Sequence, residues 1–216
     1  MNTIKNNYYI RKMATYVRLF LNKYKYNISI NSKGCYKIKK NIKGYNNKCI
    51  IESKTFIDNA YIYIKGNNNC ISIGHNCIIG PKVKFHIEGN NIKVLIGRNT
   101  TMTRNIELCA QEDNTTINIG EDCMLSNSII IRTSDSHPIY DSNTHKRLNF
   151  PKDIIIGKHV WIAPNSKIMK GSIIGDGSII GSDTTTTKEY PANCMIIGRP
   201  ATIHKRNVYW TRESLF

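Results

Sequence analysis

Residues 156–184 read IGKHVWIAPNSKIMKGSIIGDGSIIGSDT, and this stretch decides the fold. An isoleucine stands at every sixth position, and a small or β-branched residue follows four positions after each one. The isoleucines are Ile156, Ile162, Ile168, Ile174 and Ile180, and the residues that follow them are Val160, Ser166, Ser172, Ser178 and Thr184. A period of six matches neither the period of a helix nor the alternation of a strand. It predicts a prism, in which each hexad lays one short strand on a flat face and points its aliphatic residue inward.

The same phase occurs upstream in three shorter runs, each opened by Ile-Gly. These runs are Ile73, Ile79 and Phe85; Ile96, Met102 and Leu108; and Ile119, Leu125 and Ile131. Three hexads close one coil, and successive coils pair as parallel strands. The chain is therefore predicted to be all-β and to form a parallel β-helix.

Composition is compatible with one packed core, because 40% of the 216 residues are hydrophobic. No apolar run approaches the roughly 20 residues needed to cross a bilayer, and the N-terminal stretch from Met1 to Tyr8 does not resemble a secretory signal. The seven cysteines are scattered and form no short-spaced pair, so they predict neither a metal site nor a disulfide framework. We interpret them as small core residues in a reducing compartment, and we expect a cytoplasmic protein.

The net charge of +16 is concentrated at the N-terminus, where residues 1–60 carry 13 Lys and Arg against two acids. Such an excess attracts polyanions: nucleic acid, acidic membrane or acidic polysaccharide. A solvated lysine-rich face is the alternative. Residues 8–25 show apolar side chains at helical spacing, from Ile10 to Tyr24, with basic residues between them. We expect an amphipathic helix that packs on its own domain, with contact to a membrane surface as the alternative.

The longest break in the repeat separates Ile131 from Ile156, and their separation is not a multiple of six. A loop over 132–153 is therefore expected to leave the prism. It carries the sequence RTSDSHPIYD, in which His137 precedes a proline. Function concentrates in loops that project from a rigid scaffold, so His137 is a candidate functional residue.

Three stretches resemble the hexapeptide-repeat sugar O-acetyltransferases, and among them the bacterial capsular polysialic acid O-acetyltransferases. They read SDSHPIYD, KRLNFPKDIIIGKHVWIAPNSKIMKG and TTTKEYPANCMIIGRPATIHKRNVYW. The likeness extends from about Ile96 to Arg212. It implies a left-handed β-helix, a homotrimer and acetyl-CoA as co-substrate. We expect a basic N-terminal segment over 1–60 with the helix and first strands, an acyltransferase domain over 61–198 and a C-terminal tail over 199–216.

The resemblance also implies roles for the reacting groups. It makes His137 the general base, which takes the proton of a sugar hydroxyl, and places Trp161 beside the thioester. Asp135 or a backbone carbonyl would orient the imidazole. The backbone N–H after the tryptophan, that of Ala163, would face the thioester oxygen, but the next residue, Pro164, has no N–H.

Further residues follow from the same likeness. Gly181 and Ser182 would contact the pantetheine arm of CoA, although glycine follows the aliphatic residue in several hexads without any ligand. Thr187 and Lys188 match a Thr-Lys pair near the nucleotide, and phosphates suit the cations Lys188, Arg199, Lys205 and Arg206. Contacts to the acceptor are expected from Asp135, Tyr140, Lys146 and Arg147. Asn105 is expected there by likeness to another acyltransferase branch, in which an asparagine upstream of the histidine positions the acceptor.

The sequence leaves other functions open. The acceptor could be an O-antigen or another capsule sugar, free sialic acid, or the amino group of a nucleotide sugar. The basic N-terminal third favours an anionic glycan. A non-catalytic β-helix scaffold is a second class, which the presence of His137, Trp161 and Thr187-Lys188 disfavours. A nucleic-acid binder is suggested by charge alone, without any recognisable DNA- or RNA-binding module, so specific nucleic acid is not expected.

Overall fold

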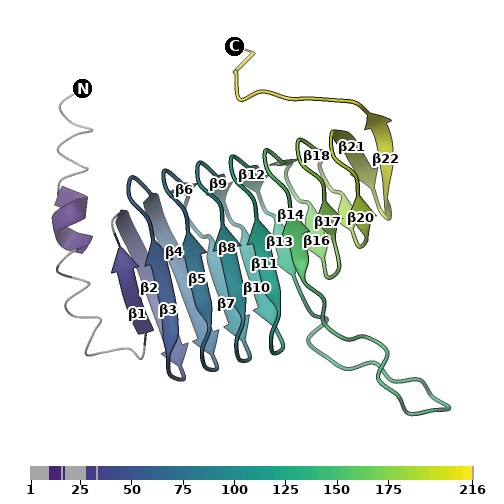
Figure 1. Ribbon diagram of the computed structural model, residues 1–216, viewed down its shortest axis with the longest axis horizontal. Helices are drawn as coiled ribbons and strands as arrows, with labels where there is room; N and C mark the ends of the chain where they lie inside the picture. The colour runs from purple at the N-terminus through teal and green to yellow at the C-terminus, as the bar shows by residue number, and fades with distance from the viewer. Residues whose placement is uncertain (1–9, 16, 18–27, 33, 216) are drawn as a thin grey trace.

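The computed structural model describes the chain except residues 1–9, 16, 18–27, 33 and 216. It shows a three-faced prism of parallel strands with a protruding arm and a tail that returns over the prism (Figure 1). Within the described residues, no helix has the length and apolar character needed to span a bilayer.

Each coil contributes one strand to each face of the prism. Face A is a sheet of β1 (Ile28–Ser32), β3 (Asn47–Ile51), β5 (Cys70–Ile73), β8 (Lys93–Ile96), β11 (Thr116–Ile119), β14 (Ile154–Ile156), β17 (Ile173–Ile174) and β20 (Glu189–Tyr190). Face B holds β6 (Ile78–Ile79), β9 (Thr101–Arg104), β12 (Met124–Asn127), β15 (Trp161–Ile162), β18 (Ile179–Ile180) and β21 (Cys194–Gly198). Face C holds β7 (Lys84–Glu88), β10 (Glu107–Gln111), β13 (Ile130–Arg132), β16 (Lys167–Met169) and β19 (Thr185–Thr186).

Faces B and C are joined into one sheet by β4 (Phe56–Lys65), which pairs with β6 through its first residues and with β7 through its last. The strand β2 (Cys35–Lys43) lies alongside β4 at the N-terminal end of the prism. The coils therefore begin well before residue 61. At the other end, β22 (Ala201–Arg206) pairs antiparallel with β21 and closes that edge of the sheet.

The predicted aliphatic stacks are confirmed in the core. On face A, Ile73, Ile96, Ile119, Ile156 and Ile174 are buried and are register partners from coil to coil. Removing each such side chain from water contributes about 1.5–3 kcal/mol before the entropy of ordering is counted. The small residues of the hexads are buried at the corners, where their hydroxyls hydrogen-bond backbone carbonyls; Ser166, for example, donates to the Ala163 carbonyl at 2.9 Å.

The upstream runs are short because the early coils exceed three hexads. Successive coils from Ile73 to Ile96 and from Ile96 to Ile119 are equal in length, and each is longer than the coil of three hexads from Ile156 to Ile174. The additional residues lengthen face C by a second inward side chain and then form a polar corner. The second inward residues, which are all buried, are Ile64, Ile87 and Ala110. At the corner, asparagines in the left-handed region repeat from coil to coil at Asn68, Asn91 and Asn114.

None of the seven cysteines, all of which lie in the described residues, forms a disulfide, and all but Cys70 are buried. Cys77 and Cys123 occupy corner positions like those of the serines, with their sulfurs 3.1 Å from the carbonyl oxygens of Gly97 and Gly157. Their places agree with the prediction of small core residues.

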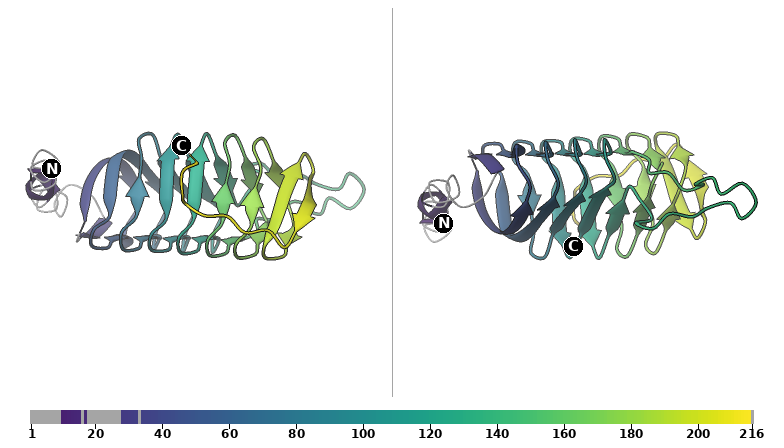
Figure 2. Two further views of the ribbon diagram at one scale, coloured as in Figure 1. Left: turned by 90° about the horizontal axis from the view of Figure 1, so that it is seen from above. Right: turned by 90° about the horizontal axis from the view of Figure 1, so that it is seen from below.

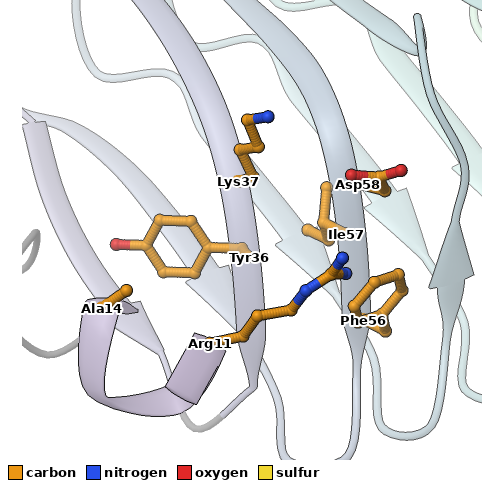
Figure 3. Close-up of a pocket in the computed structure, with 7 residues that line it drawn as sticks. All are labelled: Arg11, Ala14, Tyr36, Lys37, Phe56, Ile57 and Asp58. Atoms are coloured by element: carbon orange, nitrogen blue, oxygen red, sulfur yellow. The ribbon is translucent and has the colours of Figure 1, made fainter. Parts of the chain in front are cut away.

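The N-terminal helix is described over residues 10–15 and at 17, and the rest of the predicted helix lies outside the described residues. It sits against the first coil, where the Tyr36 N–H donates to Thr15 Oγ1 at 3.2 Å. A pocket of about 290 Å³ is lined by Arg11 and Ala14 of the helix and by residues of β2 and β4 (Figure 3). The apolar side chains of Ile10 and Met13 are exposed and do not pack on the prism. Contact between this helix and a membrane stays a prediction.

Candidate active site

The break in the repeat forms an arm, residues 132–153, which projects between β13 and β14 (Figures 1 and 2). The arm folds back as a hairpin: Tyr140 and Arg147 form an antiparallel bridge, and the Leu148 N–H donates to the Ile139 carbonyl at 2.8 Å. His137 lies on the outgoing limb with an exposed side chain. The imidazole is therefore accessible to a ligand that approaches from outside the prism.

Asn149, on the returning limb, holds the backbone directly after His137 and the side chain of Asp135 before it. Its Nδ2 donates to the His137 carbonyl at 2.8 Å and to Asp135 Oδ2 at 2.9 Å, while its Oδ1 accepts from the Ile139 N–H at 2.7 Å. One side chain thus fixes the two peptides that follow the candidate base. Nothing in the sequence marked Asn149, because an asparagine in a polar loop is most often a turn residue.

Asp135 anchors the arm to the prism, and its role in orienting the imidazole stays a prediction. Its Oδ2 accepts from Lys170 Nζ at 2.5 Å. The hydrogen bond from Lys170, with that from Asn149, holds the pKa of Asp135 below its usual value. Among the described residues, no hydrogen bond joins the His137 ring to a partner. Lys170 was also missed from the sequence, since it occupies an ordinary variable position of a hexad.

A second anchor lies beside the first. The Arg147 guanidinium pairs with both carboxylate oxygens of Glu112, at 2.7 and 2.8 Å, and Ser134 Oγ donates to the same carboxylate at 2.5 Å. The hydrogen bond from Arg147 is the largest cause of a lowered pKa at Glu112. Arg147 was expected to contact the acceptor; in this structure it ties the arm to the corner after β10.

Trp161 is half-buried on face B and faces outward. Its ring lies 6.0 Å from that of Trp210, at an interplanar angle of 49°. Trp210 belongs to the strap, residues 207–215, which runs back over the prism after β22 (Figure 2). An aromatic cover therefore lies beside the tryptophan expected at the thioester.

The strap is held by a histidine that the sequence did not single out. His159 stacks on Trp210, with ring centroids 4.0 Å apart and an angle of 7°. Its Nδ1 lies 2.6 Å from Asp122 Oδ2 and its Nε2 lies 3.0 Å from the Trp210 carbonyl oxygen. Both neighbours are hydrogen-bond acceptors, so the ring links the Asp122 corner to the backbone of the strap. Trp210 Nε1–H in turn donates to the His159 carbonyl at 2.9 Å.

Arg212 adds the strongest anchor of the strap. It pairs with Asp122 Oδ1 at 2.7 Å and donates to the carbonyls of Asn99, Asp122 and Cys123. Burial acts to raise the pKa of Asp122, but hydrogen bonds from His159 and Arg212 outweigh it and lower that pKa. The tail predicted over 199–216 is thus docked on the corner between faces A and B.

Two backbone groups expected to contact acetyl-CoA already have partners. The Ala163 N–H donates to the Ile180 carbonyl at 2.8 Å, and the Gly181 N–H donates to the Ile196 carbonyl at 2.9 Å. A Cβ on Gly181 would lie 2.6 Å from a methyl carbon of Ile197, which gives this glycine a packing role.

The other residues expected at CoA lie in the last coils and on β22. Ser182, Thr187, Lys188 and Lys205 are exposed. Arg199 is exposed as well, but its guanidinium pairs with Asp183 Oδ1 at 2.6 Å. The exposed hydroxyls and ammonium groups leave polar contacts available on this end of the prism.

The remaining residues expected at the acceptor are spread over two corners. Asn105 lies at the corner between β9 and β10, where its Nδ2 donates to Ser128 Oγ at 3.2 Å. Tyr140 and Lys146 are exposed on the arm, at the opposite end of face C. Within the described part of the chain, no hydrogen bond or ring contact joins the arm to Trp161 on face B.

A model of the bacterial transferase hexapeptide, six repeats long, matches residues 153–188. The chain is 42% identical over 90 residues to a polysialic acid O-acetyltransferase of Escherichia coli O1:K1 / APEC, which is 42% of this chain and 29% of that protein. It is 49% identical over 49 residues to the polysialic acid O-acetyltransferase of Neisseria meningitidis, 23% of each chain. The sequence matches therefore span less than a third of these two curated relatives.

Two crystal structures cover far more of the chain. The polySia-specific acetyltransferase NeuO is 35% identical with a TM-score of 0.77, over 88% of this chain and 84% of that one. The polysialic acid O-acetyltransferase OatWY is 33% identical with a TM-score of 0.67, over 82% and 92%.

The hexads and three parallel faces define a parallel β-helix, as the sequence predicted. The matches confirm the left-handed hexapeptide-repeat acetyltransferase class that the resemblance implied. Within that class, the chain belongs to the family of the polysialic acid O-acetyltransferases.

Proposed function

We propose that the chain transfers the acetyl group of acetyl-CoA to a hydroxyl of an anionic glycan of the polysialic acid type. The observation that carries this proposal is the likeness over most of the chain to two polysialic acid O-acetyltransferase structures, together with an exposed histidine on the arm. The basic N-terminal third supports an anionic acceptor, because a local excess of lysine attracts a polyanion.

In the proposed reaction, His137 takes the proton of the acceptor hydroxyl as its oxygen attacks the thioester carbonyl. The tetrahedral intermediate collapses, the C–S bond breaks, and the imidazolium returns the proton to the leaving CoA thiolate. The developing oxyanion needs an N–H or hydroxyl donor. Since the Ala163 N–H is bonded within the sheet, that donor is proposed to come from another group.

A homotrimer is part of the same proposal. The arm leaves Ile139, Tyr140, Leu148 and Phe150 more than half exposed within one chain. A second copy that packs against the arm would bury these side chains and bring His137 to the Trp161 of a neighbour. We place the reaction in the cytoplasm, because acetyl-CoA is a metabolite of that compartment and cysteines without disulfides suit its reducing conditions.

The test is an assay of CoA release with acetyl-CoA and a panel of acceptors: polysialate, sialic acid oligomers, free sialic acid and neutral capsule glycans. We expect release with polysialate and acetyl esters on the recovered polymer. Release with a neutral glycan alone would overturn the anionic acceptor but keep the enzyme. Failure to bind CoA at all would favour a non-catalytic scaffold.

A further inference from the structure

The outer surface of face C carries three side chains that metals bind, from two neighbouring strands. His86 on β7 and Cys109 on β10 are register partners, and Glu107 precedes Cys109 by two positions on the same side of the strand. His86 and Cys109 are separated along the chain by one whole early coil. The fold therefore places these residues side by side. A sequence pattern of closely spaced metal ligands would not include them, because they are far apart in the chain.

Their donor atoms lie close to one another. One ligand atom each from His86, Glu107 and Cys109 falls within 4.8 Å of the other two. Ligand atoms around tetrahedral zinc stand about 3.3–3.8 Å apart, given bond lengths of about 2.0–2.3 Å. Small side-chain rotations close that difference without any change in the backbone register.

The imidazole also has an unused nitrogen. His86 Nε2 is buried from solvent and lacks a hydrogen-bond partner among the described residues. The nearest acidic oxygen, Glu88 Oε2, is 3.6 Å away, beyond hydrogen-bond distance. Buried polar atoms without partners are rare, because leaving one unpaired is costly. A bound cation would satisfy this nitrogen.

The charges of the cluster suit a divalent ion. A thiol binds a metal ion as the thiolate, so binding at Cys109 releases the thiol proton. The thiolate and the carboxylate then supply two negative charges, and a neutral imidazole is the third ligand. Sulfur, nitrogen and oxygen donors of these kinds are the ligands that zinc takes in proteins.

We propose that His86, Glu107 and Cys109 form a binding site for Zn²⁺ or a related divalent transition metal. The metal takes a lone pair from the imidazole, one carboxylate oxygen and the thiolate, and the thiol proton is released to solvent without redox change. The fourth position faces a hollow of about 250 Å³ lined by Tyr61, Tyr63, Lys84 and Glu88. The positive charge of Lys84 opposes a cation there, and the carboxylates of Glu88 and Glu107 offset it.

The experiment uses the full chain, reduced and stripped of metal with a chelator, and titrates it with Co²⁺. We expect one equivalent to bind with a thiolate-to-cobalt charge-transfer absorption. Cys109→Ser should lose that absorption, and His86→Gln should weaken binding by at least the roughly 10–100-fold that loss of an outer-shell partner costs. Cys70→Ser, which removes the half-buried thiol on β5, is the matched control and should bind like the wild type.

Thermal unfolding gives a second measurement. Zn²⁺ should raise the Tm of the wild type and of Cys70→Ser, because it binds the folded chain, but not that of the isosteric variant Glu107→Gln. Circular dichroism verifies that each variant is folded. The proposal is overturned if the wild type shows no thiolate band, or if Cys109→Ser shows the same band as the wild type.

Discussion

The side-chain amide of Asn149 donates to the backbone carbonyl of His137 across 2.8 Å, so the histidine is positioned through its peptide group while its ring stays exposed. A base held in this way keeps a fixed Cα position and a ring that can turn toward a bound hydroxyl. The same amide also binds Asp135, which Lys170 ties to the prism.

Asn149→Ala should therefore lower turnover by roughly 10–100-fold, the penalty of a small misplacement of a reacting group. Binding of acetyl-CoA, measured by calorimetry, should not change. Asn143→Ala, at the exposed tip of the arm, is the control and should retain full turnover. Equal losses in both variants would show that Asn149 has no special role.

His137→Ala should reduce turnover by roughly 10²–10⁴-fold, the usual contribution of a general base. CoA affinity should stay near that of the wild type. His145 is a second exposed histidine on the same arm, and His145→Ala should leave the rate intact. Normal CoA release by the His137 variant would exclude it as the base.

Trp210→Ala should raise the KM for acetyl-CoA, because it removes the ring that stacks on His159 and lies beside Trp161. Arg212→Gln should act in the same direction by loosening the strap, and Trp161→Ala should weaken acetyl-CoA use directly. Tyr209→Ala is the control, since Tyr209 is 85% exposed. Unchanged kinetics in the Trp210 variant would mean that the strap has no part in CoA binding.

Acid should release the arm from the prism. Asp135 and Glu112 have pKa values below their ordinary ones, so they favour the docked arm fully above the ordinary carboxyl pKa of about 4. That contribution is lost as the pH falls through the lowered pKa values. Hydrogen exchange of residues 132–153 should be constant between pH 7 and 5, after correction for intrinsic rates, and should accelerate below about pH 4. In Asp135→Asn the arm should already exchange faster at pH 7.

The lysines of β2 should matter for a polymer more than for a monomer. Lys37, Lys39 and Lys43 are exposed and Lys40 is half-buried at the N-terminal end of the prism. Replacing all four by Gln should weaken binding of polysialate, measured at low salt, more than binding of free sialic acid. The matched control replaces the exposed Lys93, Lys152, Lys158 and Lys167. If both sets of replacements weaken polysialate binding equally, the net charge of the protein, and not the position of the β2 lysines, determines that binding.

Much of the prism could be predicted, because its inward residues recur at a fixed spacing. The hexads from Ile156 to Ile180 and the break that holds His137 were both visible in the sequence. The longer early coils were not predicted, because the second inward residue and the asparagine corner of face C interrupt the six-residue spacing. In the sequence they look like an end of the repeat. The clusters around His159 and Asn149 were also hidden. Arg212 meets Asp122 across 90 residues, and only the folded chain defines that pairing.

The early coils have a consequence for how this chain can change in length. Each is a unit of constant length that contacts only its neighbours. Gain or loss of one whole unit between β5 and β8 would lengthen or shorten the prism by one strand spacing, about 4.8 Å, and leave every other stack intact. An insertion of another size has to leave the prism as a loop, as the arm does. The distance between the lysine-rich end and the arm can therefore change only in steps of one coil. Such a change leaves the coils that carry His137 and Trp161 unaltered.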